Sequence, residues 1–258
     1  MNDIINYFPM FLLILVRVTA FFVTIPIFSY RNIPSTHKIG LAVFLAWMML
    51  FTIDPVVITI DEMFILLIMK EVLIGLLIGF TAQILFAAIQ IAGGFIDFQM
   101  GFAIANVIDP QTGIQSPLIG QYLHTFALLF LLSVDAHHLL LDGIFYSYEF
   151  IPIDQPWIPF GDTGFSNFLI KTLSMMFIIA FQMALPIVGS LFLVDVALGI
   201  MARTMPQLNI FVVGIPIKII VSLVMLIVVM ASFIYLVRDL FENILVTLRT
   251  LMKIVGGV

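Results

Sequence analysis

The chain contains no cysteine and few charged residues. The absence of cysteine excludes a disulfide framework and thiol chemistry, but it leaves the cellular compartment open. Only 10% of the 258 residues are charged and 63% are hydrophobic. An average soluble chain is about a quarter charged and about half apolar. The composition therefore indicates a protein that uses the lipid bilayer as its solvent.

Several sequence signatures of function are also missing. No basic patch suggests contact with nucleic acid, and no glycine-rich phosphate loop or nucleophile elbow is present. No pair of carboxylates has a spacing typical of catalysis. We therefore expect no enzymatic activity, no cofactor and no nucleic-acid partner. No cationic region precedes the first apolar run, which Arg17 interrupts, so a cleaved signal peptide is not expected.

The mean hydropathy of +1.24 is concentrated in six apolar stretches separated by charges and helix breakers. They are Ile4–Phe28, Ile39–Ile53, Val72–Ile96, Leu118–Val134, Thr172–Val194 and Ile219–Val237. The second has about 15 residues, against the roughly 20 that cross a bilayer. The connection over residues 135–171 is acidic and resembles a solvated segment. We predict an all-α polytopic membrane protein whose residues 1–258 form one membrane-embedded domain.

The distribution of Lys and Arg gives conflicting membrane orientations. Arg31 and Lys38 place the first connection in the cytoplasm, and Arg203 with Lys218 fits the same side. Six crossings would put the C-terminal tail outside, yet this tail is basic. We therefore expect that one segment does not cross as a lipid-exposed helix. Helical hairpins packed inside an assembly would remove the conflict.

A polar stripe runs along the predicted long central helix, from Val72 to about Ala103. At 100° per residue, the stripe consists of Gly79, Gln83, Gln90, Gly94, Asp97 and Gly101. The opposite face carries Ile91, Phe95, Phe98 and Phe102. Lipid tails offer no partner for carboxamides or a carboxylate, so the stripe must face protein or water. Gly75-xxx-Gly79 permits close helix approach, and we predict that the stripe packs against other subunits.

A polar loop without Lys or Arg follows this helix. Its residues are Asn106, Val107, Ile108, Asp109, Pro110, Gln111, Thr112, Gly113, Ile114, Gln115, Ser116 and Pro117. Asp109-Pro110 favours a turn, Gly113 permits a backbone reversal, and Pro117 discourages helix before Leu118. Irregular backbone beside membrane helices is tolerated where it is buried in protein or lines an aqueous cavity. An ordinary surface connector is the alternative.

Isolated charges inside apolar stretches require partners. We expect Arg17, Asp195, Arg203 and Lys218 to be buried charges. An arginine at the bilayer centre costs roughly 3 kcal/mol on insertion scales. Structural ion pairs between helices are the preferred interpretation. A proton relay and contact with another subunit are alternatives, and the spacing does not identify the pairs.

The segment from Leu198 to Lys218 is predicted to break between two helices. Pro206 would end or kink the first, and Pro216 suits the first turn of the second. Lys218 would then lie near a helix N-terminus, where the macrodipole disfavours a cation. An acid such as Asp195 would compensate for that cost.

Four residues have side chains typical of a metal site: His124, Asp135, His137 and His138. His124 lies about three helical turns from His137, too far to share a metal on one continuous helix. The other three lie at the end of an apolar helix, where His and Asp serve as caps and interface anchors. We therefore predict no metal site.

Three segments resemble the export-gate family of type III secretion. They are Gly93–Gly101, Val107–Gly113 and Arg203–Phe211. The resemblance covers essentially the whole chain. It implies one subunit of a helical gate containing several copies of FliP and FliQ, with FlhB outside. The location would be the bacterial cytoplasmic membrane at the flagellar basal body.

The resemblance also implies that residues 106–120 form a plug in a pore for unfolded flagellar subunits. The proton motive force and a separate ATPase would drive export. We hypothesise that this segment obstructs the conduit, with Gly101 and Gly113 as points of backbone freedom. A virulence-type gate, a proton-coupled small-solute transporter and a purely structural assembly factor are alternatives. The transporter is disfavoured because no inverted repeat is detectable.

Overall fold

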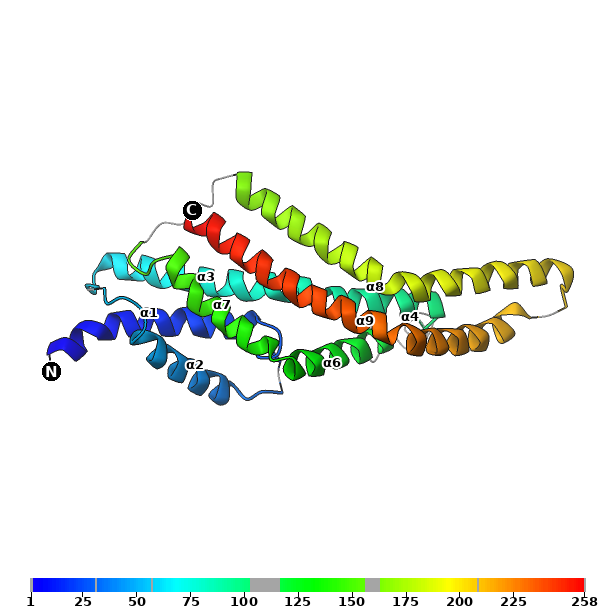
Figure 1. Ribbon diagram of the computed structural model, residues 1–258, viewed down its shortest axis with the longest axis horizontal. Coiled ribbons are helices and arrows are strands. Elements are labelled where there is room, and N and C mark those ends of the chain that lie inside the picture. Colours follow the sequence, from blue (N-terminus) through cyan, green and yellow to red (C-terminus); the bar gives the residue numbers. More distant parts are fainter. Residues whose placement is uncertain are drawn as a thin grey trace. The chain divides into compact units, whose positions relative to one another are not determined.

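The computed structural model describes residues 2–30, 32–56, 58–102, 117–155, 163–207 and 209–257. Within these ranges all regular structure is helical (Figure 1). The helices are α1 (Asn2–Thr24), α2 (Ser35–Leu50), α3 (Glu62–Phe86), α4 (Ala88–Met100), α6 (Leu118–Ser133), α7 (Ala136–Phe150), α8 (Thr163–Thr204) and α9 (Ile210–Gly256). The predicted all-α fold is confirmed.

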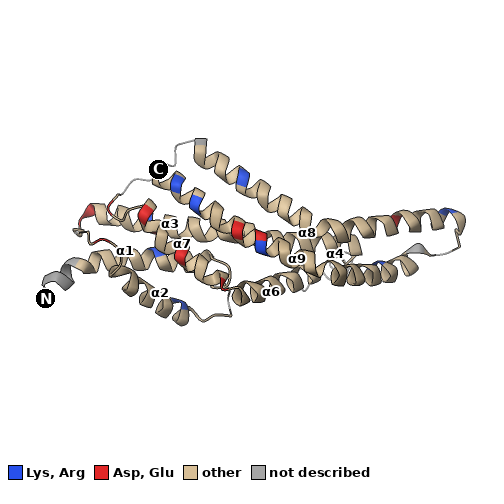
Figure 2. Cartoon of the chain, viewed as in Figure 1, with Lys and Arg blue, Asp and Glu red and all other residues tan. Residues whose placement is uncertain are grey.

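Four helical segments in the described part of the chain are long and apolar enough to cross a membrane. Among the described residues the candidate spans are Tyr7–Thr24, Glu62–Met100, Gly164–Thr204 and Phe211–Gly256. Helices α6 and α7 form a fifth candidate if the pair is counted as one span. Helix α2 has only 16 residues, fewer than the roughly 20 needed to cross. Figure 2 shows how sparse charged residues are along the helices, which confirms a polytopic membrane protein.

Helix α7 lies in the acidic connection, where the sequence analysis did not predict a helix. Its buried residues are Ala136, Leu140, Ile144, Ser147 and Tyr148. Their spacing of three and four places them along one face, while Asp142 and Glu149 are exposed. The acidic residues that made this segment look solvated therefore belong to one face of an amphipathic helix.

The chain divides into two compact units. Unit 1 comprises residues 1–86, 134–173 and 242–258, and unit 2 comprises residues 87–133 and 174–241. In unit 1, α1 packs against both α2 and α3; in unit 2, α4 packs against α6. The single membrane-embedded domain stays a prediction.

The small-residue pattern of α3 brings this helix against α1, with the two helices side by side in Figure 1. A Cβ atom on Gly75 would lie less than 3.0 Å from the Arg17 carbonyl oxygen and from Ala20 Cβ. A Cβ on Gly79 would meet Thr24 Oγ1 and the Phe21 carbonyl at similarly short distances. The predicted close approach is confirmed. Its partner, however, is a helix of the same chain and not the other subunit that we predicted.

The break between α8 and α9 differs in detail from the prediction. Helix α8 ends at Thr204, before Pro206, as expected. Helix α9 begins at Ile210, and the Phe211 amide donates to Asn209 Oδ1 at 3.2 Å. Because this asparagine caps the helix, Pro216 lies inside α9 and not in its first turn. Lys218 is then two turns from the N-terminus, so the predicted dipole penalty does not arise.

Candidate functional site at the base of the central loop

Asp97 of α4 joins the helix before the central loop to the first turn of the helix after it. Its carboxylate accepts the backbone N–H of Ile119 at 3.0 Å and that of Gly120 at 3.3 Å. These amides belong to the first turn of α6, where the helix supplies no acceptor of its own. A carboxylate at the positive end of the helix dipole is favourable. Asp97, 5% exposed, therefore has hydrogen-bond partners within its own chain, and the packing of the stripe against other subunits stays a prediction.

The same two helices touch through their backbones. A Cβ atom on Gly93 of α4 would lie less than 3.0 Å from Gly120 Cα and N. A Cβ on Gly120 would lie 3.1 Å from the Gln90 carbonyl oxygen and 3.0 Å from Pro117 Cβ. Only glycine permits so close an approach on both sides. We call the Asp97 hydrogen bonds and the Gly93–Gly120 contact the loop clamp.

A polar network holds the C-terminal end of α4. Gln99 Nε2 donates to Asp195 Oδ2 at 2.8 Å, and Lys218 pairs with Asp195 Oδ1. Lys218 Nζ also lies 3.5 Å from the Gln99 carbonyl oxygen. The side chains of Lys218 and Asp195 are 19% and 36% exposed, so the ion pair contributes at most about 1 kcal/mol. The predicted pairing of Lys218 with Asp195 is present, whereas sequence reasoning assigned no role to Gln99.

Helix α4 ends at Met100, and its C-cap residue Gly101 has a φ of 92°. This left-handed conformation favours glycine at a helix C-terminus. The predicted role of Gly101 as a point of backbone freedom stays a prediction. A cavity of about 290 Å³ adjoins Gly101 and the Asp195–Lys218 pair. The chain therefore leaves α4 at a capped helix end and enters α6 at a helix start that the loop clamp fixes.

The predicted plug residues 106–116 lie outside the described residues. Pro117 is half-buried and immediately precedes α6, as predicted from its effect on helix starts. Its carbonyl oxygen accepts the Gln121 N–H at 2.8 Å. The role of the loop as a plug stays a prediction.

The remaining stripe residues are not equivalent. Gln83 is half-buried and its Oε1 atom is buried without a hydrogen-bond partner, whereas Gln90 is exposed. On the opposite face, Phe98 is 73% exposed and Phe95 is 39% exposed. The buried Asp97 and the exposed phenylalanines give α4 the polar-inside, apolar-outside pattern of a membrane helix.

Arg17 of α1 has a partner in unit 1 that sequence reasoning did not find. Its guanidinium pairs with Glu71 of α3, and both side chains are 0% exposed. Nη1 donates to Ser147 Oγ at 2.9 Å, and Nη2 donates to the Ile151 carbonyl at 3.0 Å. The guanidinium carbon lies 3.8 Å from the centroid of the Tyr148 ring. The predicted need of Arg17 for an ion pair is confirmed.

Lys70 extends this buried cluster. Its Nζ lies 2.8 Å from Glu71 Oε1 and donates to the carbonyls of Pro152 at 2.7 Å and Ile153 at 2.9 Å. The cluster thus ties α1, α3 and α7 to the backbone that follows α7. In contrast, Arg203 at the end of α8 is exposed, so the expectation that it is buried was wrong.

Three of the four residues considered for a metal site come together. Ligand atoms of Asp135, His137 and His138 all lie within 4.8 Å of one another, and His124 is not part of this group. Asp135 adopts a φ of 55° at the junction of α6 and α7. Asp135 and His138 are exposed, and the adjacent N-terminus of α7 disfavours a cation. We assign no metal to this group.

These features define a polytopic helical membrane protein in which the loop clamp joins the two helices that flank a central loop. Residues 8–244 match the sequence profile of the bacterial export proteins, family 1, and the chain belongs to this family. It is 59% identical, over 99% of both chains, to the flagellar biosynthetic protein FliR of Bacillus subtilis (strain 168). The Escherichia coli (strain K12) protein of that name is 31% identical, over 89% of this chain and 87% of the relative.

A relative named for virulence secretion also matches. The Yop proteins translocation protein T of Yersinia pestis is 35% identical, over 59% of this chain and 58% of the relative. The resemblance stated from the three sequence segments is therefore confirmed at the level of the family. The chain is a membrane protein of an export family.

Replacing Asp97 with leucine is expected to lower the unfolding free energy by about 1–3 kcal/mol, because two buried N–H groups lose their acceptor. Thermal unfolding of the purified full chain in detergent measures this. Asp97→Asn keeps one acceptor oxygen and should give an intermediate loss. The exposed Gln90→Leu is the matched control on the same helix. Equal melting temperatures for Asp97→Leu and Gln90→Leu would contradict the assigned contact.

Proposed function

We propose that this chain is a subunit of the flagellar type III protein export gate in the bacterial cytoplasmic membrane at the basal body. The observation that carries this proposal is the 59% identity, across nearly the full length, to a flagellar biosynthetic protein. The role is that of a conduit for unfolded flagellar subunits and not of a catalyst. FliP, FliQ and FlhB are the proposed partners.

The exposed apolar surface of the long helices supports assembly with other chains. In α8 and α9 only 33% and 11% of the most apolar windows are buried within the chain. Large side chains are exposed along both helices, among them Phe192, Phe211 and Tyr235. Lipid or neighbouring apolar helices can cover this surface, and a gate subunit meets both.

The gating mechanism that we propose uses the contacts at the loop base. Residues 106–120 obstruct the conduit, and the loop clamp holds α4 to the first turn of α6, where this segment ends. The network of Gln99, Asp195 and Lys218 attaches the preceding helix end to α8 and α9. Because the side chains of this network are partly exposed, water can replace their hydrogen-bond partners at a small cost in free energy. The loop would then move when an export substrate arrives, while its base stays formed.

Deleting Ile108–Ser116 is expected to raise the ion conductance of the assembled complex several-fold, because the obstruction is removed while the loop clamp remains. Planar-bilayer recording of purified complexes measures this conductance. Asp109→Asn, which keeps the loop length, is the control for altered charge. An unchanged conductance in a normally assembled deletion complex would show that the loop does not close the conduit.

Four experiments separate the proposed function from its alternatives. Co-purification from native membranes tests the partners, and restored swimming of a deletion strain tests the flagellar assignment against a virulence-type gate. Solute uptake by the reconstituted lone chain would support a proton-coupled transporter instead. A cysteine at position 114 should crosslink to a substrate stalled during export. Absence of that crosslink in an active complex would favour a purely structural assembly factor.

A further inference from the structure

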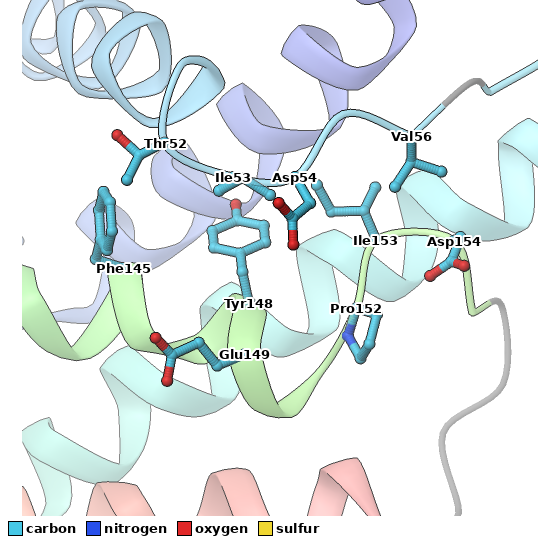
Figure 3. A pocket seen from close by; sticks show the side chains of 10 residues that line it. All are labelled: Thr52, Ile53, Asp54, Val56, Phe145, Tyr148, Glu149, Pro152, Ile153 and Asp154. Atoms are coloured by element: carbon cyan, nitrogen blue, oxygen red, sulfur yellow. The ribbon is translucent and has the colours of Figure 1, made fainter.

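Unit 1 contains a cavity that the proposed export role does not use. Its volume is about 420 Å³, within the usual range of small-ligand sites. One wall is the connection between α2 and α3, residues 52–56, and the other is the end of α7 with residues 152–154. Figure 3 shows these two walls facing each other.

A buried hydroxyl group in this cavity lacks a partner. Tyr148 is only 7% exposed, and its hydroxyl oxygen is buried without a hydrogen bond. Figure 3 shows the Tyr148 side chain among the lining residues, with its hydroxyl directed at the segment that carries Ile53 and Asp54. Leaving such a group unpaired costs about 1–3 kcal/mol. A polar ligand in the cavity would recover that cost.

The buried cluster behind the cavity fixes its geometry. The Arg17 guanidinium lies against the Tyr148 ring and donates to the Ile151 carbonyl. Lys70 donates to the carbonyls of Pro152 and Ile153. The ring and the backbone wall are therefore positioned before any ligand binds, which reduces the entropy lost on binding.

The charge of the cavity selects a cation. Asp54, Glu149 and Asp154 contribute three carboxylates, and no Lys, Arg or His is among the residues that line the cavity in the described part of the chain. In the buried cluster, Arg17 and Lys70 carry two positive charges and Glu71 carries one negative charge, so the cluster has a net charge of +1. The cavity and the cluster together therefore have a net charge of −2. The hydroxyl oxygen of Tyr148 can accept a hydrogen bond from a cationic donor.

The apolar part of the lining selects the kind of cation. Ile53, Val56, Phe145, Pro152 and Ile153 supply much of the surface. A hydrated divalent ion would need six or more oxygen ligands and would leave this surface without contact. We propose that the cavity binds a primary ammonium group carried on an aliphatic stem. The source is either a free diamine or the lysine side chain of a neighbouring polypeptide.

Calorimetric titration of cadaverine into the purified full chain in nanodiscs tests this inference without depending on export activity. We expect saturable binding that weakens at least five-fold in Asp54→Asn and in Tyr148→Phe. Tyr148→Phe removes only the hydroxyl group and keeps the ring on Arg17. Asp142→Asn makes the same charge change on the exposed face of α7, away from the cavity, and should bind as the parent chain does.

The outcomes distinguish the ligand classes and their sources. No saturable cadaverine binding, equal binding of 1-pentanol, or Ca²⁺ binding without amine binding would overturn the proposal. If the assembled complex binds cadaverine as the lone chain does, the natural ligand is a free amine. If only the lone chain binds cadaverine, a neighbouring lysine fills the cavity in the complex. A chain that binds the amine but does not restore swimming would keep this inference and reject the proposed function.

Discussion

Replacing Gly93 with alanine is expected to lower the unfolding free energy by about 3 kcal/mol and to abolish export-dependent swimming. The added Cβ would lie less than 3.0 Å from backbone atoms of Gly120, and neither helix can relieve that clash by moving a side chain. Overpacking costs about 1–3 kcal/mol where side chains can adjust, so a backbone clash belongs at the upper end. Separating α4 from α6 would also lengthen the Asp97 hydrogen bonds. Thermal unfolding and a soft-agar swimming assay measure the two effects.

Gly94 provides the matched control for this prediction. It is the next residue of α4, and a Cβ atom there would have its nearest neighbour, Pro117 Cγ, at an ordinary 3.6 Å. Gly94→Ala should therefore keep the loop clamp, and alanine should slightly favour the helix. Equal losses in both variants would mean that helix propensity or a partner subunit, and not the Gly93–Gly120 contact, governs this position.

Most helices could be predicted from the sequence, because hydrophobic periodicity is a local signal. Five of the six apolar stretches correspond to one helix each, because apolar runs bounded by proline and charge are a strong signal in membrane proteins. The third, Val72–Ile96, was predicted as part of one long helix, whereas it covers parts of α3 and α4, which are separated at Ala87. Helix α7 was missed because Asp142 and Glu149 gave the segment an acidic composition, although its buried residues recur at helical spacing. The hydrophobic period was the better guide there than the charge.

The partners of polar residues could not be read from the sequence. Asp97 pairs with the backbone of Ile119 and Gly120, which carries no side-chain signal. Arg17 pairs with Glu71, which lies 54 positions further along the sequence. The periodicity within one helix does not indicate which residue of another helix it contacts. The one pair anticipated, Asp195 with Lys218, lies on consecutive helices joined by a short break. Short connections restrict which partners are possible.

Replacing Glu71 with glutamine should produce the largest loss of stability in unit 1, about 3–5 kcal/mol. Arg17 and Lys70 would then remain buried without a counter-charge, and removing one member of a buried pair leaves the full desolvation cost of the other. Cells should accumulate little of this variant, and the purified protein should melt well below the parent chain. Glu62→Gln, an exposed change in the first turn of the same helix, is the control.

Glutamine keeps the length and one acceptor oxygen of Glu71 while removing its charge, so the comparison with Glu71→Leu separates the two contributions. If hydrogen bonding to Arg17 dominated, glutamine would preserve most of the stability and leucine would lose it. We expect both variants to be severely destabilised, because two buried cations rely on one buried carboxylate. A glutamine variant that melts within about 2 °C of the parent chain would show that water reaches the cluster and screens its charges.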